Sequence, residues 1–259
     1  MYFQMISKYI KDKFYKCEDY FYRSISQECR EFGERGTAYF TGIDNAYLNP
    51  LFLRENQDPF EKILKEAQKF YTNHMCPWCV IILEHLTSEK HLKILSTFNF
   101  FLKETSVVMA IDLKESVKFE CFKKCHIKFM SDTLNEWMIP LIGAFGTAEE
   151  LTRRYSETHI HARSKKANFY HFTMYQENQP VSSLTLSITQ KGACLNDVGT
   201  RPEFQKKGFA STLILFALSE AQKLGAMYCF LDASTAGFSL YKRLGFTPLF
   251  KNNIFLKLD

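Results

Sequence analysis

The chain is 259 residues long and carries 33 Lys and Arg against 28 Asp and Glu, a formal net charge of +5. With 46% hydrophobic and 24% charged residues it has the composition of a globular protein, which excludes disordered, collagen-like and small disulfide-framework classes. Its apolar runs are far shorter than the ~18 residues of a membrane span. Basic and acidic residues alternate along the chain, so neither a membrane nor a nucleic-acid partner is expected.

The eight cysteines are read as free thiols, because no secretory signal opens the chain; a cytoplasmic location is expected. Cys76-Pro77-Trp78-Cys79 has the spacing of a redox dithiol, but it leads directly into an apolar run, which favours a structural strand residue. Cys121, Cys125 and His126 have no second pair at matching spacing, so no metal site is expected.

Helices and strands alternate along the first half of the chain. The expected elements are a helix over 6–30, an extended stretch over 37–43, a loop over 44–59, a helix over 60–74, a strand over 78–83, a helix over 91–98 and a strand over 107–113. The charged stretch 114–124 is typical of a linker. We therefore expect two domains, over 1–124 and 125–259.

The second half is expected to begin as a strand, two helices and a three-strand meander. Its expected elements are a strand over 126–130, helices up to about residue 166, strands over 169–176, 181–189 and 193–198, a helix from 209, a strand over 227–231, a helix from 237 and a strand ending at 258. Thr133 and Glu136 have the spacing of a capping box. His159, His161 and His171 cannot share one helix face, and no role is assigned to them.

The two halves show the same order of elements, which predicts a duplicated fold. When the halves are aligned, Leu95 falls opposite Tyr241, and Asn99 falls opposite Gly245, where Asn also tolerates a left-handed turn. The glycines of the first half lie only at 33, 36 and 42, so its loop over 44–59 lacks the small residue that a phosphate requires. No phosphate site is therefore expected in the first half.

Residues 205–211, with the sequence QKKGFAS, lie between an expected strand and an expected helix. The first turn of a helix leaves backbone N–H groups unpaired and carries a partial positive charge, so it suits an anion. Gly208 allows close approach to the backbone, and Ala210 is nearly as small. Lys206 and Lys207 are disfavoured at a helix N-terminus by roughly 0.3–1 kcal/mol unless an anion is present. These residues predict a pyrophosphate site.

Here the sequence resembles the GNAT superfamily of acyl-CoA-dependent N-acyltransferases, whose signature is Arg or Gln, two residues, Gly, one residue, and Gly or Ala. Gln205, Gly208 and Ala210 match it. The string over 198–204 is similar to the strand and loop that lead into the signature, and residues 233–246 are similar to a second hallmark. The resemblance is close over 126–258. Over 36–113 it is weaker and is similar to the degenerate N-terminal copy of two-domain members.

The resemblance implies an α/β (α+β) fold of tandem GNAT-like domains, each a mixed, mostly antiparallel central sheet flanked by helices. It implies that the sheet splays between the strands over 193–198 and 227–231 and admits pantetheine there. Main-chain groups of Val198 and Thr200 would bind the pantetheine amides, and residues 205–211 would bind the pyrophosphate. The residues expected to bind acetyl-CoA are Val198, Gly199, Thr200, Gln205, Lys206, Lys207, Gly208, Phe209, Ala210, Ser211 and Ser234.

Tyr241 occupies the position at which superfamily members commonly carry the general acid that protonates the leaving sulfur. Asp232 and Glu203 are the nearby carboxylates in sequence and are both candidates for the general base. The expected function is an acetyl-CoA-dependent N-acetyltransferase that acts on a primary amine. The alternative is a non-catalytic acyl-CoA-binding or interaction protein. The acceptor stays open, and a monomer is favoured because duplication can replace dimerisation.

Overall fold

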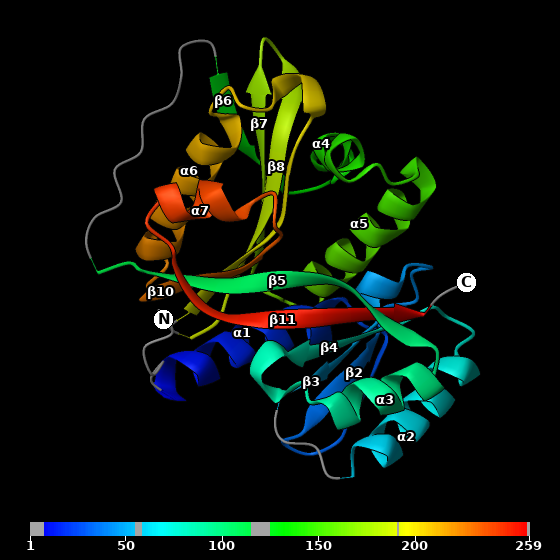
Figure 1. Ribbon diagram of the computed structural model, residues 1–259. Helices are drawn as coiled ribbons and strands as arrows, with labels where there is room; N and C mark the ends of the chain where they lie inside the picture. Colours follow the sequence, from blue (N-terminus) through cyan, green and yellow to red (C-terminus); the bar gives the residue numbers. More distant parts are fainter. Residues whose placement is uncertain (1–7, 55–58, 115–124, 191, 258–259) are drawn as a thin grey trace.

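The computed structural model describes residues 8–54, 59–114, 125–190 and 192–257, and its described strands form one 11-stranded sheet (Figure 1). The strand order is β1-β2-β3-β4-β11-β5-β10-β9-β8-β7-β6. The strands are β1 Glu28–Glu31, β2 Gly36–Phe40, β3 Pro50–Leu53, β4 Cys79–Leu83, β5 Phe100–Asp112, β6 Cys125–Phe129, β7 Phe169–Gln176, β8 Gln179–Ile188, β9 Gly192–Thr200, β10 Tyr228–Ala233 and β11 Thr247–Lys257. The α-helices are α1 Lys8–Ile25, α2 Phe60–Asn73, α3 Glu89–Thr97, α4 Asn135–Phe145, α5 Glu149–Ser164, α6 Phe209–Lys223 and α7 Phe238–Arg243, and the 3-10 helices are η1 Ala46–Leu48, η2 Glu84–Leu86 and η3 Pro202–Phe204.

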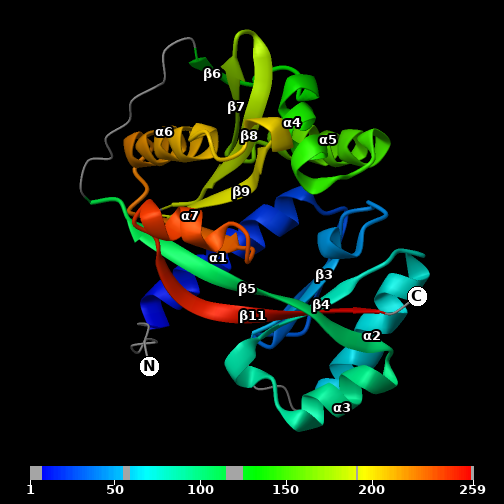
Figure 2. The same cartoon turned by 45° about the horizontal axis from the view of Figure 1, so that its top comes forward.

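The two halves of the chain exchange their last strands. β5, which ends the first half, pairs antiparallel with β10 of the second half, and β11, which ends the second half, pairs antiparallel with β4 of the first. β5 and β11 also pair with each other from Phe100–Lys257 to Ala110–Thr247. In Figures 1 and 2 these two long strands cross the middle of the molecule. The expected division at residue 124 therefore divides the chain but not the sheet.

Helices cover both faces of the sheet, and strand alternation determines which face each helix meets. In β7, Phe172 and Met174 pack in one core with α6, whereas Phe169 on the opposite face packs with α4 and α5. In the first half, α2 and α3 pack on β4 through a core that includes Leu64 and Leu95. α1 lies between the two halves (Figure 2), with its residues in the cores of both.

The duplicated order of elements is present in the structure, with α2-β4-α3-β5 in the first half and α6-β10-α7-β11 in the second. Each half also contains one parallel pair in the equivalent place, β3 with β4 and β9 with β10. Asn99 and Gly245, which align between the halves, both adopt left-handed backbone, with φ of 64° and 94°. The fold class expected from the resemblance is confirmed.

Two local predictions were wrong. The segment over 44–59 is not all loop, because the buried run Pro50–Leu53 forms β3 between β2 and β4. The capping box at Thr133 and Glu136 does not form: α4 has Leu134 at its N-cap, without a side-chain cap. Glu136 instead accepts a hydrogen bond from the Tyr175 hydroxyl at 2.7 Å. Of the expected linker, residues 115–124 lie outside the described residues.

The strand exchange predicts that the second half does not fold alone. A fragment over 125–259 lacks β5. The edge of β10 would therefore have unpaired backbone groups, and core residues such as Leu231 and Phe246 would be exposed to solvent. We expect this fragment to be aggregated or unfolded by circular dichroism and size-exclusion chromatography, whereas the full chain unfolds cooperatively. A monomeric fragment with a cooperative transition would contradict a shared core.

Candidate functional site

The sheet opens between β9 and β10. These parallel strands pair over only three positions, from Tyr228–Gly192 to Phe230–Cys194, although β9 continues to Thr200 and β10 to Ala233. In the first half, by contrast, β3 pairs with β4 along its whole length of four residues. The wedge expected from the resemblance therefore has a counterpart in the second half, while the equivalent strands of the first half stay closed.

A β-bulge in β9 shapes one wall of the wedge. The register with β8 shifts between Ser183–Gly199 and Thr185–Asn196, and Asp197 within the bulge has a φ of 54°. Gly199 points its carbonyl at β8, because it accepts a bond from Ser182 Oγ at 3.0 Å. Since main-chain groups alternate sides along a strand, Val198 and Thr200 present theirs to the opposite edge, which is the wedge.

Gly199 allows α4 to pack closely against β9. A Cβ at this position would lie 2.7 Å from Cδ2 of Leu141 in α4 and 3.1 Å from Cβ of Ala144, so α4 can approach β9 closely only over a glycine. The main chain of β9 on either side of Gly199 is held by this contact.

The loop between η3 and α6 leads into the N-terminus of α6 through two residues with positive φ. Lys206 and Gly208 have φ of 60° and 87°, and Gly208 is the N-cap of α6. Gln205 Nε2 donates to the Thr200 carbonyl at 3.2 Å, which ties the loop to the end of β9. Lys206 and Lys207 are exposed beside it. The first-turn N–H groups of a helix find no acceptor within the helix, so this end is suited to an anion.

A cavity of about 390 Å³ lies at the wedge. It reaches both faces of the sheet: Leu231 and Tyr241 belong to the core under α6, whereas Ser106 and Asp232 lie on the face toward α1. Of the expected site residues, the cavity brings together Val198, Asp232, Ser234 and Tyr241. The residues of the loop 205–211 do not line it.

Asp232 is an exposed residue near the end of β10, and it lines the cavity. Its Oδ2 accepts bonds from Ser106 Oγ at 2.8 Å and from Asn252 Nδ2 at 3.1 Å. Desolvation by the surrounding protein raises the pKa of this carboxyl to about 6, against the effect of the two hydrogen bonds. Asp232 is therefore ionised at neutral pH and able to accept a proton.

Tyr241 on α7 is 8% exposed and lines the cavity. Gly237 makes room for its ring, because a Cβ at Gly237 would lie 2.8 Å from Tyr241 Cε2. Among the described residues none forms a hydrogen bond with the Tyr241 hydroxyl. Burial raises the pKa of Tyr241 well above its ordinary value near 10, so the phenol keeps its proton through the physiological range.

Glu203, the other candidate base, lies elsewhere. It is an exposed residue of η3, it pairs with Arg201 at 2.5 Å, and it is not among the residues that line the cavity.

Sequence reasoning missed the carboxyls that other elements bring to the cavity. Glu18 comes from α1, Glu104 from β5 and Asp197 from the bulge of β9. Burial raises the pKa of Glu18 to about 7 although Arg54 lies 2.9 Å away, and it raises the pKa of Asp197 to about 6. No local motif marks these residues, because they become neighbours only through strand exchange and the position of α1.

Two of the three histidines to which no role was assigned form a buried pair behind the bulge. His159 Nδ1 and His171 Nε2 lie 2.9 Å apart, and His159 Nε2 lies 3.8 Å from Asp197 Oδ2. Burial lowers the pKa of His159 to about 3 and that of His171 in the same direction, so both rings are neutral. Tyr155 donates to Asp197 Oδ1 at 2.8 Å. This cluster supports the bulged strand from the face under α5.

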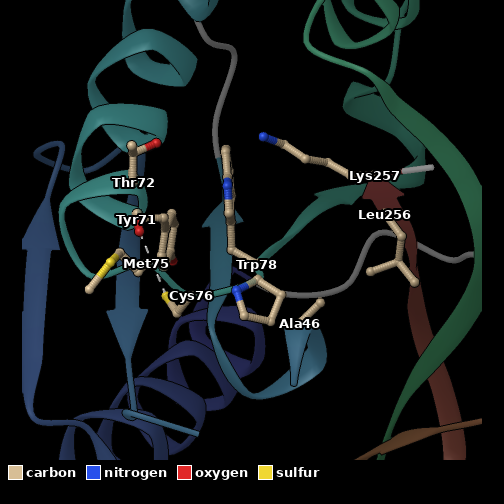
Figure 3. A pocket seen from close by; sticks show the side chains of 9 residues that line it. Ala46, Tyr71, Thr72, Met75, Cys76, Trp78, Leu256 and Lys257 are labelled. Carbon is tan, nitrogen blue, oxygen red and sulfur yellow. Dashed lines mark hydrogen bonds between the residues drawn. The ribbon is translucent and has the colours of Figure 1, made fainter. Parts of the chain in front are cut away.

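A second hollow lies in the first half, beside the Cys-Pro-Trp-Cys sequence (Figure 3). Cys76 lines it together with Trp78, over whose ring the Lys257 ammonium lies at 5.5 Å. Cys79 is fully buried in β4, as the strand interpretation predicted. Burial raises the pKa of the Cys76 thiol to about 11 and also raises that of Cys79, the opposite of the shift that a redox dithiol needs.

In the part of the chain that the structure describes, no helix is both long and apolar enough to cross a membrane. Within the same residues, no group of three or more His, Cys, Asp or Glu side chains is arranged to hold a metal ion.

Comparison with known proteins finds similarity to one family. Residues 132–246 match the acetyltransferase (GNAT) family model. A GCN5-related N-acetyltransferase from Kribbella flavida is similar in structure, with a TM-score of 0.66 at 12% identity over 99% of this chain and 97% of that chain. Another from Sphaerobacter thermophilus has a TM-score of 0.61 at 16% identity over 86% and 76% of the two chains.

A tandem GNAT protein from the clavulanic acid biosynthesis pathway is also similar, with a TM-score of 0.59 at 11% identity over 87% of this chain and 80% of that chain. No curated protein matches the sequence. At these identities the solved structures show the similarity of the fold alone. The family model adds a match of the sequence within the second half. The chain therefore has a tandem GNAT fold, and its residues 132–246 match the acetyltransferase (GNAT) family model.

Proposed function

We propose that this protein is an acetyl-CoA-dependent N-acetyltransferase that transfers the acetyl group directly from the thioester to a primary amine. One observation carries the proposal: the wedge between β9 and β10 leads into a cavity that holds a buried tyrosine hydroxyl, Tyr241, and a carboxylate of raised pKa, Asp232. An acid and a base on two walls of one cavity suit a reaction in which one proton leaves the nucleophile and another reaches the leaving group.

The acyl donor would bind along the wedge. The main-chain groups that Val198 and Thr200 turn toward the wedge suit the amides of an extended pantetheine arm, and the Thr200 carbonyl also accepts a bond from Gln205. The left-handed turn at Gly208 and the first turn of α6 suit a pyrophosphate, with Lys206 and Lys207 nearby to balance its charge. The remaining residues of the loop, Gln205 and 209–211, would act mainly through their backbone, and Ser234 lies at the cavity end of β10.

The reaction needs two proton transfers. The amine lone pair attacks the thioester carbon, and the nitrogen becomes more acidic as the new C–N bond forms, so Asp232 takes its proton. The C–S bond then breaks, and the electron pair leaves with sulfur, which receives a proton from Tyr241. The products are the N-acetylated amine and the free thiol of coenzyme A, and solvent restores the two side chains.

Replacing Tyr241 with phenylalanine is expected to lower kcat by about 10- to 100-fold, because general acids contribute about 10²–10⁴-fold and a thiolate is a good leaving group even without help. The dissociation constant for acetyl-CoA is expected to stay unchanged, since the hydroxyl acts on the leaving sulfur. Release of free thiol from acetyl-CoA with a panel of amines measures the rate, and calorimetry measures binding. If Tyr241→Phe turns over every acceptor as fast as the parent, the assignment of the acid is wrong.

The same pair of measurements separates the enzyme from the alternative. Binding of acetyl-CoA together with amine-dependent thiol release supports the transferase. Binding without turnover on any amine supports a non-catalytic acyl-CoA-binding protein.

A further inference from the structure

The cavity is strongly acidic in a protein of net positive charge. Four carboxyl groups line it, from Glu18, Glu104, Asp197 and Asp232, and among the described residues that line it there is no Lys, Arg or His. We propose that the acceptor is a short aliphatic diamine or polyamine, whose reacting amine lies at Asp232 while a second ammonium group lies at Glu104. This inference rests on the proposed function, because it names the substrate class of the same site.

The charges of the four carboxyls are balanced unequally. Glu18 has a cation of its own, since Arg54 Nη2 lies 2.9 Å from its Oε2. Among the described residues, the hydrogen-bond donors to these two carboxyls are neutral: Tyr155 and Thr185 donate to Asp197, and Ser106 and Asn252 donate to Asp232. His159, which faces Asp197, is neutral because burial lowers its pKa to about 3.

Glu104 is an exposed residue at the other end of the cavity, where the Tyr47 hydroxyl donates a hydrogen bond to it. No cationic side chain balances it within the part of the chain that the structure describes. Glu104 and Asp232 repel each other, and this repulsion contributes to the raised pKa of Asp232. A ligand that binds with two ammonium groups would relieve the repulsion, and the reacting group would lose one proton to solvent before its lone pair attacks.

The sheet sets the spacing between Glu104 and Ser106, the residue whose hydroxyl donates to Asp232. Ser106, which bonds Asp232, lies two residues from Glu104 on the same face of β5. The neighbouring strand repeats the spacing, because Asn252 pairs with Ser106 and Ile254 pairs with Glu104. Two residues of a strand span about 6.6 Å, so Glu104 and the Ser106 that bonds Asp232 are about as far apart along β5 as the ends of an extended chain of about four or five methylene groups.

The rest of the lining suits such a chain. Tyr22, Tyr47 and Phe52 offer aromatic faces, which attract ammonium groups and pack against methylenes. A monoamine would leave Glu104 without a cation, and an amine that also carries a carboxylate would be repelled by Glu104. The acidic cavity therefore selects against both.

The test compares amines of matched length. Thiol release from saturating acetyl-CoA is measured with 1,4-diaminobutane, 1,5-diaminopentane, 1-aminobutane and 4-aminobutanoate. We expect kcat/KM for the diamines to exceed that for 1-aminobutane at least about tenfold, with 4-aminobutanoate lowest. Glu104→Gln is expected to lower the ratio of diamine to 1-aminobutane rates by about tenfold, because it removes only the charge.

Glu89→Gln is the matched control, since Glu89 is an exposed residue of α3 that does not line the cavity; the ratio should keep the parent value. Equal or better rates for 1-aminobutane or 4-aminobutanoate would overturn the inference while the transferase stands. If no amine is acetylated, calorimetry with 1,4-diaminobutane decides. Binding that weakens in Glu104→Gln would retain the diamine site and overturn the transferase, and absence of binding would overturn the site.

Discussion

Replacing Asp232 with asparagine is expected to lower kcat/KM for the amine by about 10²–10⁴-fold, the range in which general bases contribute. The carboxylate lies at the end of β10 in the same cavity as Tyr241, and its raised pKa of about 6 makes it a better proton acceptor than an ordinary aspartate. Asparagine keeps the shape and still offers an oxygen to Ser106 Oγ, so the loss would reflect proton transfer. Initial rates of thiol release at fixed acetyl-CoA measure it.

The pH profile gives this assignment a second readout. Because the base acts in its ionised form, the rate of the parent is expected to fall as the pH decreases through about 6, the pKa of Asp232. The residual activity of Asp232→Asn should lack this acid limb. Tyr241 contributes no limb below its own pKa, which burial raises above 10, so it stays protonated across the same range.

Stability and a matched carboxyl provide the controls. The pKa of Asp232 is raised in the folded protein, so ionising it opposes folding as the pH rises through about 6. Asparagine is therefore not expected to lower the Tm at neutral pH.

Glu203→Gln removes the other carboxyl that the sequence suggested, outside the cavity, and is expected to keep the parent rate. A large loss in Glu203→Gln with little in Asp232→Asn would reverse the assignment of the base.

The sequence predicted those features that are encoded locally. The amphipathic run from Phe60 and the glycine-containing loop before Phe209 each predicted the helix that follows, because periodicity and glycine act over a few residues. The alignment of the halves also placed Asn99 at the position equivalent to Gly245, and both residues adopt a positive φ.

The features that arise from distant contacts could not be predicted in this way. Neither β5 nor β11 carries a signal for the half in which its neighbours lie, because β-pairing is specified by the whole sheet. In the sequence, Glu104 resembles any exposed strand residue. It lines the same cavity as Asp232 only because the halves exchange their last strands. Likewise, Glu18 meets the cavity only because α1 lies between the halves. The acidic cavity is thus a product of tertiary structure.

Replacing Gly208 with aspartate is expected to weaken acetyl-CoA binding at least about 100-fold. The new carboxylate would lie at the N-cap of α6, where the proposed pyrophosphate is placed, and two unit charges 4 Å apart near a protein surface repel by about 4 kcal/mol. Calorimetric titration of the parent and the variant measures the effect. The loss should shrink at high salt, because exposed charges are screened.

Backbone strain must be separated from charge, and the chain offers a matched glycine for this purpose. Gly225 has a φ of 85°, close to the 87° of Gly208, and a Cβ there would meet open space. An aspartate at either position bears a similar left-handed cost of roughly 1–2 kcal/mol, but only Gly208 lies at the expected phosphate site. Aspartate is also a favourable N-cap, so Gly208→Asp should leave α6 intact. Gly225→Asp is expected to bind acetyl-CoA as the parent does; equal loss in both variants would assign the effect to strain and remove the helix N-terminus from the site.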